Sequence, residues 1–212
     1  MKMYTSTGTI STRDSCNRYN VGLLMSASWR DPSKWPFFAI DNGCYSAYVR
    51  DVAWDCSTFM RLVHRCVTEG YTPDFIVIPD KVADANSLAF SEKWVPILKE
   101  LAPDFRIYLP VQDGMKVEDV LAFCSHHFVS GLFVGGTTQW KIETMAEWAK
   151  IAHANDMECH VGRIGPVQRM MLAELAGADS IDSTTWVQRK NALPKYMKAY
   201  HEQTRLDGGV VE

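Results

Sequence analysis

Two aspartates, Asp41 and Asp182, stand where short apolar segments of the sequence turn polar. Asp41 follows Phe-Phe-Ala-Ile, and Asp182 closes the segment Asp-Ser-Ile-Asp. A carboxylate beside an apolar run is costly to bury unless it is paired or used. If the two carboxylates meet, one can stay ionised as a nucleophile while the other keeps a proton, because close like charges push their pKa values apart. The pair therefore points to nucleophilic and acid–base chemistry.

Each of these aspartates also has a purely structural explanation. Asp41 is followed by Asn-Gly, and the sequence Asp-Asn-Gly readily forms a turn. Asp182 is followed by Ser-Thr-Thr and could cap the next helix, which is a common role for aspartate. The elements around the two residues decide between these explanations.

Polar or small residues end other apolar runs as well. Asp80 follows Phe-Ile-Val-Ile-Pro and could line a site, or form a turn with Lys81 as a neutralising neighbour. Gln112 follows Tyr-Leu-Pro-Val; its amide could read the edge of a planar base or satisfy loop backbone. Gly135 and Gly136 follow Leu-Phe-Val and allow a ligand to approach the backbone closely.

The last quarter of the sequence combines glycines with basic residues. Gly162, Gly165 and the predicted helix start at Pro166 could make a small anion site through free N–H groups, but ordinary tight-turn geometry is a strong alternative explanation for the glycines. The net charge of −3 gives no general electrostatic footprint for nucleic acid. A local group could still contact phosphates. Its members are Arg163, Arg169, Arg189 and Lys190.

These residues are positioned by an alternation of short apolar runs and longer amphipathic stretches. The short runs are rich in β-branched and aromatic residues, which is typical of parallel strands buried on both faces. They are Lys2–Thr5, Tyr19–Ser26, Phe37–Asp41, Phe75–Pro79, Arg106–Val111, Gly131–Gly135, Glu158–Gly162 and Ser180–Asp182. The amphipathic stretches predict helices over Ser57–Glu69, Asn86–Leu101, Val117–His126, Thr138–Asn155, Pro166–Ala176 and Trp186–Thr204.

Eight strands alternating with helices predict an α/β fold, a compact (β/α)8 barrel. Such barrels typically run to about 250 residues. This chain has 212, so we expect trimmed loops. We expect one domain over residues 1–212. The sequence has no GxGxxG or GxxxxGK[ST], which disfavours a nucleotide-binding open sheet. In a barrel the active site lies at the C-terminal ends of the strands, which favours the catalytic explanation for Asp41.

The remaining composition excludes several classes of protein. Six cysteines form no CxxC pair and have no histidine at zinc-finger spacing, so we expect reduced thiols and a cytoplasmic location. His126, His127 and His160 show no metal spacing, and His160 reads as part of a strand. No signal peptide or membrane-length apolar run is present, so no membrane partner is expected.

Taken in order, five segments resemble the tRNA-guanine transglycosylase superfamily. They are FAIDNGCYS, PDFIVIPDKVAD, LPVQDG, SGLFVGG and CHVGRIGPVQRMMLAELAGADSIDST, and they extend from about Phe37 to Thr185. The last segment is the most specific, because its glycines, its leucine-rich helix and Asp182 keep the order and spacing of the family.

The resemblance implies a role for each matching residue. Asp182 matches the nucleophilic aspartate of the family, and Asp41 matches the aspartate that works as general acid and base near the sugar. Asp80 and Gln112 match residues that hold the purine-like base. Gly135 and Gly136 match the turn that contacts the polar edge of the base, and Gly162 lies in the matching strand end.

The chain also departs from the tRNA-acting members. These carry a zinc site of three cysteines and a histidine near the C-terminus, whereas no cysteine follows Cys159 here and Cys44 replaces a glycine of the first motif. The chain is more similar to reduced relatives in phages and DNA-modification loci, some of which exchange guanine in DNA for a 7-deazaguanine.

The resemblance implies an enzyme that breaks an N-glycosidic bond through a covalent aspartyl intermediate and inserts a 7-deazaguanine-type base. DNA is the expected nucleic acid, ahead of tRNA, and no metal or redox cofactor is expected. Three alternatives stay open: a hydrolytic DNA glycosylase, a barrel lyase or isomerase for phosphorylated small molecules, and a module that only binds nucleic acid. A barrel this small could also form a homodimer.

Overall fold

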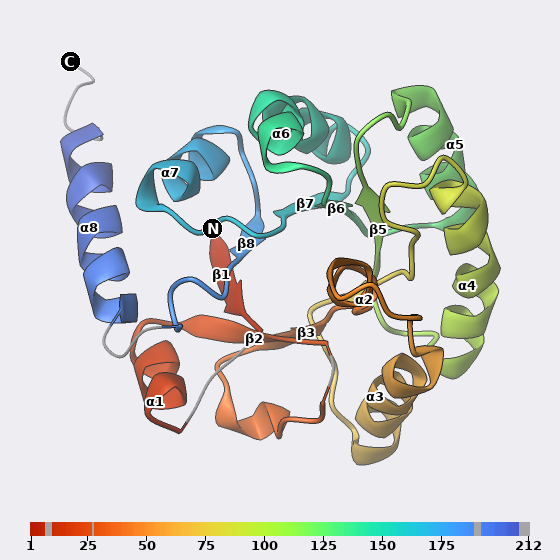
Figure 1. The fold of residues 1–212 in the computed structure, drawn as a ribbon, viewed down its shortest axis with the longest axis horizontal. Coiled ribbons are helices and arrows are strands. Elements are labelled where there is room, and N and C mark those ends of the chain that lie inside the picture. The colour runs from red at the N-terminus through yellow and green to blue at the C-terminus, as the bar shows by residue number, and fades with distance from the viewer. Residues whose placement is uncertain (7–9, 27, 189–191, 208–212) are drawn as a thin grey trace.

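A closed barrel of eight parallel strands forms the centre of the molecule, with the strands in chain order (Figure 1). The computed structural model describes residues 1–6, 10–26, 28–188 and 192–207. Strand β1 pairs with β2 on one side and with β8 on the other, which closes the ring. The predicted (β/α)8 barrel is therefore confirmed.

Each of the eight predicted strand segments contains a strand, although the strands are short. Their bounds are β1 Lys2–Thr5, β2 Val21–Met25, β3 Phe38–Ile40, β4 Ile76–Val77, β5 Ile107–Val111, β6 Gly131–Val134, β7 Glu158–Val161 and β8 Ser180–Asp182. Nearly all of their residues are buried, because helices cover the outside of the barrel and side chains fill its inside.

The helices surround the barrel, except α2, which follows β3 and lies over the strand ends (Figure 1). Their bounds are α1 Ile10–Arg18, α2 Cys44–Val49, α3 Cys56–Glu69, α4 Ser87–Leu101, α5 Val117–His127, α6 Thr138–His153, α7 Val167–Leu175 and α8 Ala192–Asp207. In the described part of the β2–β3 connection the helix is reduced to a 3-10 turn at Pro32–Lys34, which is one trimmed loop. Within the described ranges, no helix has the length and apolarity needed to cross a bilayer.

Two helices went unpredicted and one begins later than expected. Helix α1 has the polar sequence ISTRDSCNR and α2 has only six residues, so neither shows a clear apolar period. Helix α8 begins at Ala192 and not at Trp186. The Trp186 side chain is fully buried, and its Nε1 donates to the Gly165 carbonyl at 2.8 Å, which holds that residue in the turn after β8.

The core has two layers. The larger layer packs the strands against the helices, and the smaller one fills the barrel with Tyr4, Leu24, Ala39, Phe75, Val77 and Tyr108. Phe75 stacks on Tyr108 with ring centroids 4.2 Å apart, and Phe133 stacks on His160 at 4.6 Å. These rings form an aromatic layer inside the barrel, below the strand ends that carry the polar residues.

We predict that Gly131→Ala destabilises the barrel more than Gly70→Ala. A Cβ at Gly131 would lie 2.6 Å from the Tyr108 ring and 2.8 Å from the Glu158 carbonyl oxygen. The Tyr108 ring is buried and stacked, so it cannot move aside, and we expect a loss of about 2 kcal/mol in the free energy of unfolding.

Gly70 serves as the matched control. It has a φ of +71° and nothing within 4 Å of an added Cβ. Gly70→Ala therefore costs only the strain of a left-handed backbone conformation, about 1 kcal/mol. Urea unfolding followed by tryptophan fluorescence measures both variants. Equal losses would show that the contact with Tyr108 does not restrict this position.

Candidate active site

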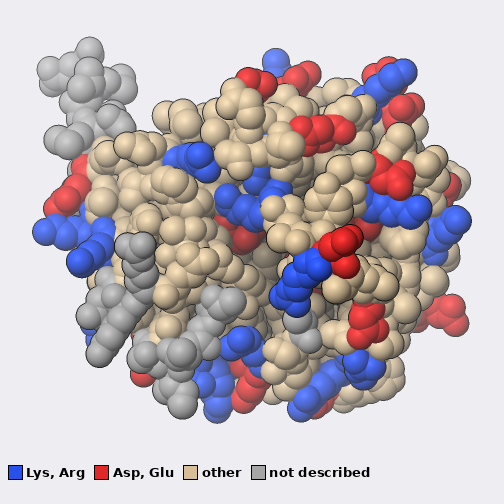
Figure 2. Space-filling view, in the orientation of Figure 1, with Lys and Arg blue, Asp and Glu red and all other residues tan. Residues whose placement is uncertain are grey.

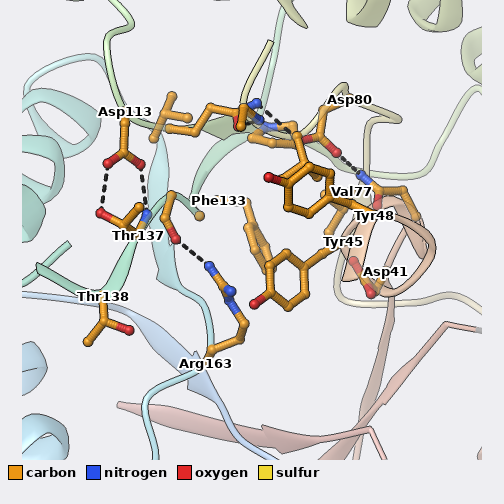
Figure 3. Close-up of a pocket in the computed structure, with 18 residues that line it drawn as sticks. Asp41, Tyr45, Tyr48, Val77, Asp80, Asp113, Phe133, Thr137, Thr138 and Arg163 are labelled. Carbon is orange, nitrogen blue, oxygen red and sulfur yellow. Dashed lines mark hydrogen bonds between the residues drawn. The ribbon is translucent and has the colours of Figure 1, made fainter. Parts of the chain in front are cut away.

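A cavity of about 380 Å³ opens at the C-terminal ends of the strands. It lies where a barrel places its active site, and its volume falls within the range of about 300–1,000 Å³ that is usual for small-molecule sites. Most of its lining follows β3, β4, β5 and β6, and Arg163 follows β7 (Figure 3). Asp41, Asp80, Gln112, Gly135, Gly136 and Arg163 are all among the lining residues, so the closed barrel brings most of the predicted site together.

The half-buried carboxyl group of Asp41 comes directly after β3. Burial raises its pKa to about 7, with further contributions from the negative charges of Asp182 and Asp80. Hydrogen bonds from the backbone amides of Gly43 and Asn42 oppose this rise. A carboxyl group with this pKa carries a proton in a large fraction of molecules at neutral pH, which suits a general acid.

Asn42 fixes the turn that presents Asp41. Its Nδ2 donates to the Ile78 carbonyl and to Asp80 Oδ1, both at 2.8 Å, and its Oδ1 accepts from the Cys44 amide at 2.8 Å. The Asp-Asn-Gly sequence is therefore both a turn and a part of the site, with Asn42 making the turn and Asp41 facing the cavity. Sequence reasoning placed the turn chemistry on Asp41 and missed Asn42.

Asp80 follows β4 and lies on the same side of the cavity as Asp41, across from Asp113 and Thr137 (Figure 3). Burial raises the pKa of its carboxyl group to about 6, while hydrogen bonds with Asn42 and Cys44 and the positive charge of Arg163 hold it lower than burial alone would. Asp80 is thus ionised more readily than Asp41, and it can accept hydrogen bonds from a ligand in the cavity.

The amide of Gln112 is engaged by the protein itself. Its Oε1 accepts from the Ala83 amide at 2.8 Å, and its Nε2 lies 2.8 Å from the Lys81 carbonyl, 3.0 Å from Ser87 Oγ and 3.3 Å from Asp80 Oδ2. Gln112 therefore hydrogen-bonds the backbone of the loop, one of the two roles expected of it. It contributes to the site indirectly, because it holds Asp80 and the loop after Asp80 in place.

Gly135 and Gly136 form a tight turn after β6. Gly136 has a φ of +59°, and a Cβ there would lie 2.4 Å from Asp113 Oδ2 and 2.6 Å from the Trp140 ring, so this position requires glycine. Asp113 fixes the turn from outside: its two oxygens accept from the Thr137 amide and hydroxyl, each at 2.7 Å (Figure 3). The sequence analysis did not single out Asp113.

Asp182, at the end of β8, is 6% exposed and lies beside the cavity instead of lining it. Its Oδ1 accepts from the Arg163 backbone amide at 3.1 Å and lies 3.1 Å from His160 Nε2. Among the described residues, Oδ2 has no hydrogen-bond partner. The carboxylate is thus held by one oxygen, and the other is available for chemistry.

Gly162 and His160 lie beside Asp182. A Cβ at Gly162 would lie 2.8 Å from the Phe133 ring, so glycine here lets that ring pack, whereas Asp182 Oδ1 would be at an ordinary contact distance of 3.4 Å. The His160 ring is fully buried in the barrel, and its Nδ1 lies 2.8 Å from Ser180 Oγ. Sequence reasoning placed His160 in a strand, which the structure confirms. It missed the contact with Asp182, which only the pairing of β7 with β8 creates.

Of the four basic residues predicted to contact phosphates, the structure describes Arg163 and Arg169. Arg163 points into the cavity: its guanidinium donates to the Gly136 carbonyl, and its Cζ lies 3.7 Å from the centroid of the Tyr45 ring (Figure 3). Arg169 is half-buried on α7. Arg189 and Lys190 lie outside the described residues. On the face in view in Figure 2, Lys and Arg are interspersed with Asp and Glu.

Comparisons with known proteins add no further constraint on the site. No family model matches the chain, and no curated protein matches it significantly in sequence. In the described ranges, no group of three or more His, Cys, Asp or Glu side chains is arranged to hold a metal ion.

We predict that Asp41→Asn stabilises the fold more at pH 8.5 than at pH 5. The folded-state pKa of about 7 lies above the ordinary value of 3.8, so the native state binds the proton more tightly than the unfolded chain. Ionising Asp41 therefore destabilises the fold as the pH rises from about 4 to above 7. Each pKa unit corresponds to about 1.4 kcal/mol.

Asparagine never ionises, so the variant escapes this cost, and we expect its gain to be larger by roughly 2 kcal/mol at the higher pH. Thermal unfolding of both proteins at the two pH values measures it. A gain that is independent of pH would contradict a raised pKa at Asp41.

Proposed function

We propose that the protein breaks the N-glycosidic bond of a nucleotide in DNA and transfers the sugar carbon to a free 7-deazaguanine-type base. The observation that carries this proposal is the pairing of two differently held carboxyl groups on one barrel rim. Asp41 has a pKa of about 7, whereas Asp182 is held through Oδ1 with Oδ2 free of partners in the described chain. The resemblance of the five ordered segments to base-exchanging enzymes gives the substrate class.

The roles follow from the two environments. Asp182 Oδ2 attacks C1′ of the target nucleotide, the bond from C1′ to the base nitrogen breaks, and Asp41 gives its proton to the departing base. An incoming base then gives a ring proton to the Asp41 carboxylate and attacks C1′, which releases Asp182. Two inversions at C1′ give net retention of configuration.

The cavity suits the base, and its edge suits the sugar. Tyr45, Phe133 and Val77 offer apolar surfaces that a planar ring can contact, and Asp80 and the Gly135–Gly136 turn offer polar groups at the rim of such a ring. Asp182 lies outside this lining, as expected of a group that acts on the sugar and not on the base. The target nucleotide must leave its stack to enter, so flipped or single-stranded DNA is the substrate form.

We predict that Asp182→Ala abolishes base exchange. Purified protein is incubated with guanine-containing DNA oligonucleotides, single-stranded and duplex, and with a labelled 7-deazaguanine base. Label incorporation and guanine release are both measured. Loss of the nucleophile should lower the single-turnover rate by at least about 10³-fold, because no covalent intermediate can form. Asp104→Ala, which removes an exposed aspartate after α4, is the matched control.

The assay also separates the alternatives. Guanine release without incorporation would replace exchange with hydrolysis, the glycosylase reaction, at the same site. Incorporation into tRNA but not DNA would keep the chemistry and change the substrate. No reaction with any DNA or tRNA, or full activity in Asp182→Ala, would overturn the proposal.

We further predict that Asp41→Asn lowers the rate by about 100-fold or more, as loss of a general acid does. Asparagine cannot protonate the departing base, so the loss should be smaller for a substrate whose base leaves readily without a proton. Single-turnover rates with guanine and with a base of lower basicity measure this difference. Equal losses on the two substrates would assign Asp41 a role in binding only.

A further inference from the structure

Lys141, on α6, is a charged side chain buried beside the site. It is only 1% exposed and is among the largest fully buried side chains of the described residues. A buried lysine is costly unless its charge is compensated or used. An apolar side chain could fill the same space at lower cost, so the position calls for an explanation beyond packing.

Lys141 is connected to Asp182 through one peptide group. Its Nζ donates to the Gly162 carbonyl oxygen, which belongs to the peptide bond between Gly162 and Arg163. The N–H of that same peptide donates to Asp182 Oδ1 at 3.1 Å. The carbonyl and the N–H of a trans peptide point in opposite directions, so the ammonium group and the carboxylate lie on opposite sides of it. The three groups form a chain of two hydrogen bonds, from cation to peptide to anion.

In such an arrangement each hydrogen bond strengthens the other. An ammonium group on the carbonyl polarises the peptide, and the polarised N–H becomes a better donor to the carboxylate. A hydrogen bond to the ionised form of a carboxyl group favours that form. The arrangement also holds Arg163 at a φ of +60°, which is unfavourable for a residue with a side chain and is kept only where contacts impose it.

The charges that face Lys141 come from several elements. Arg163 and Arg169 oppose its charge, whereas Asp182 and Asp113 favour it, and burial is the largest single effect. Together they lower the pKa of the Lys141 ammonium group to about 7. The positive charge of Lys141 is therefore present below pH 7 and is lost above it.

We propose that Lys141 is a positioning residue that acts on Asp182 through the Gly162–Arg163 peptide, fixing Oδ1 and so orienting Oδ2 for attack. Lys141 does not itself touch the substrate, because its ammonium group lies behind the peptide. The inference rests on the proposed function insofar as Asp182 is the nucleophile. The peptide relay itself can be measured without any substrate.

Kinetics provide the first test, with Lys141→Met as the variant and Lys150→Met, an exposed lysine of the same helix, as the control. Single-turnover rates are measured against pH, and substrate binding is measured separately. We expect Lys141→Met to lower the rate by roughly 10-fold to 100-fold, the usual effect of losing a partner that orients a reacting group. The part of the pH dependence near pH 7 that arises from Lys141 should disappear, and substrate affinity should not change.

NMR provides the second test and needs no activity. In the wild-type protein the Arg163 amide proton should shift upfield as the pH rises through about 7, when the ammonium group loses its charge. Asp41 titrates in the same range. The component due to Lys141 is therefore the part that persists in Asp41→Asn and vanishes in Lys141→Met. The wild-type titration is informative even if the methionine variant fails to fold.

The outcomes separate the two proposals. If Asp182→Ala is inactive while Lys141→Met keeps the wild-type pH profile, or if the Arg163 amide proton does not respond to Lys141, the relay is wrong and the proposed function stands. If Asp182→Ala stays active, the proposed function fails, and the NMR titration alone decides whether the peptide relay exists.

Discussion

The repulsion among the carboxylates at the C-terminal rim of the barrel is the interaction on which the rest of the site depends. Burial and then the negative charges of Asp182 and Asp80 raise the pKa of Asp41, so these groups share one electrostatic environment in a partly desolvated space. Charges of one sign in such a space cannot all ionise without compensation. The surroundings of the three carboxyl groups differ, and these differences distinguish Asp41, Asp80 and Asp182 from one another.

Asp41 keeps a proton more readily than an ordinary carboxyl group, because the backbone amides of Gly43 and Asn42 do not offset the effects of burial and nearby charge on its pKa. Asp80 meets it with partners: Asn42, the Cys44 side chain and the charge of Arg163. Asp182 receives the Arg163 amide, whose peptide is itself held by the buried Lys141. One carboxyl group with a strongly raised pKa, one held by several partners and one held through a single oxygen thus arise from three identical side chains. The same separation of paired carboxyl groups underlies glycosidic chemistry in general.

The sequence predicts the barrel well because its strongest local signals coincide with the elements that matter. Apolar runs such as Phe-Ile-Val-Ile-Pro mark strands even where, as in β4, only two residues pair regularly. The polar residue after each run then falls on one rim, which is why Asp41 and Asp80 could be assigned to the cavity before any coordinates. Helices α1 and α2 escape prediction because a polar or very short helix carries no apolar period.

The contacts that tune the site could not be predicted, because they depend on register and not on local pattern. His160 reads as an ordinary strand residue until the pairing of β7 with β8 sets it beside Ser180 and below Asp182. Lys141 reads as the polar side of an amphipathic helix, yet the packing of α6 against β7 turns it toward Gly162. The aspartates follow from the strand pattern alone, whereas the groups that set their protonation come from neighbouring strands and helices. The same aspartates at the same strand ends could therefore take other roles if only neighbouring residues such as His160 and Lys141 were different.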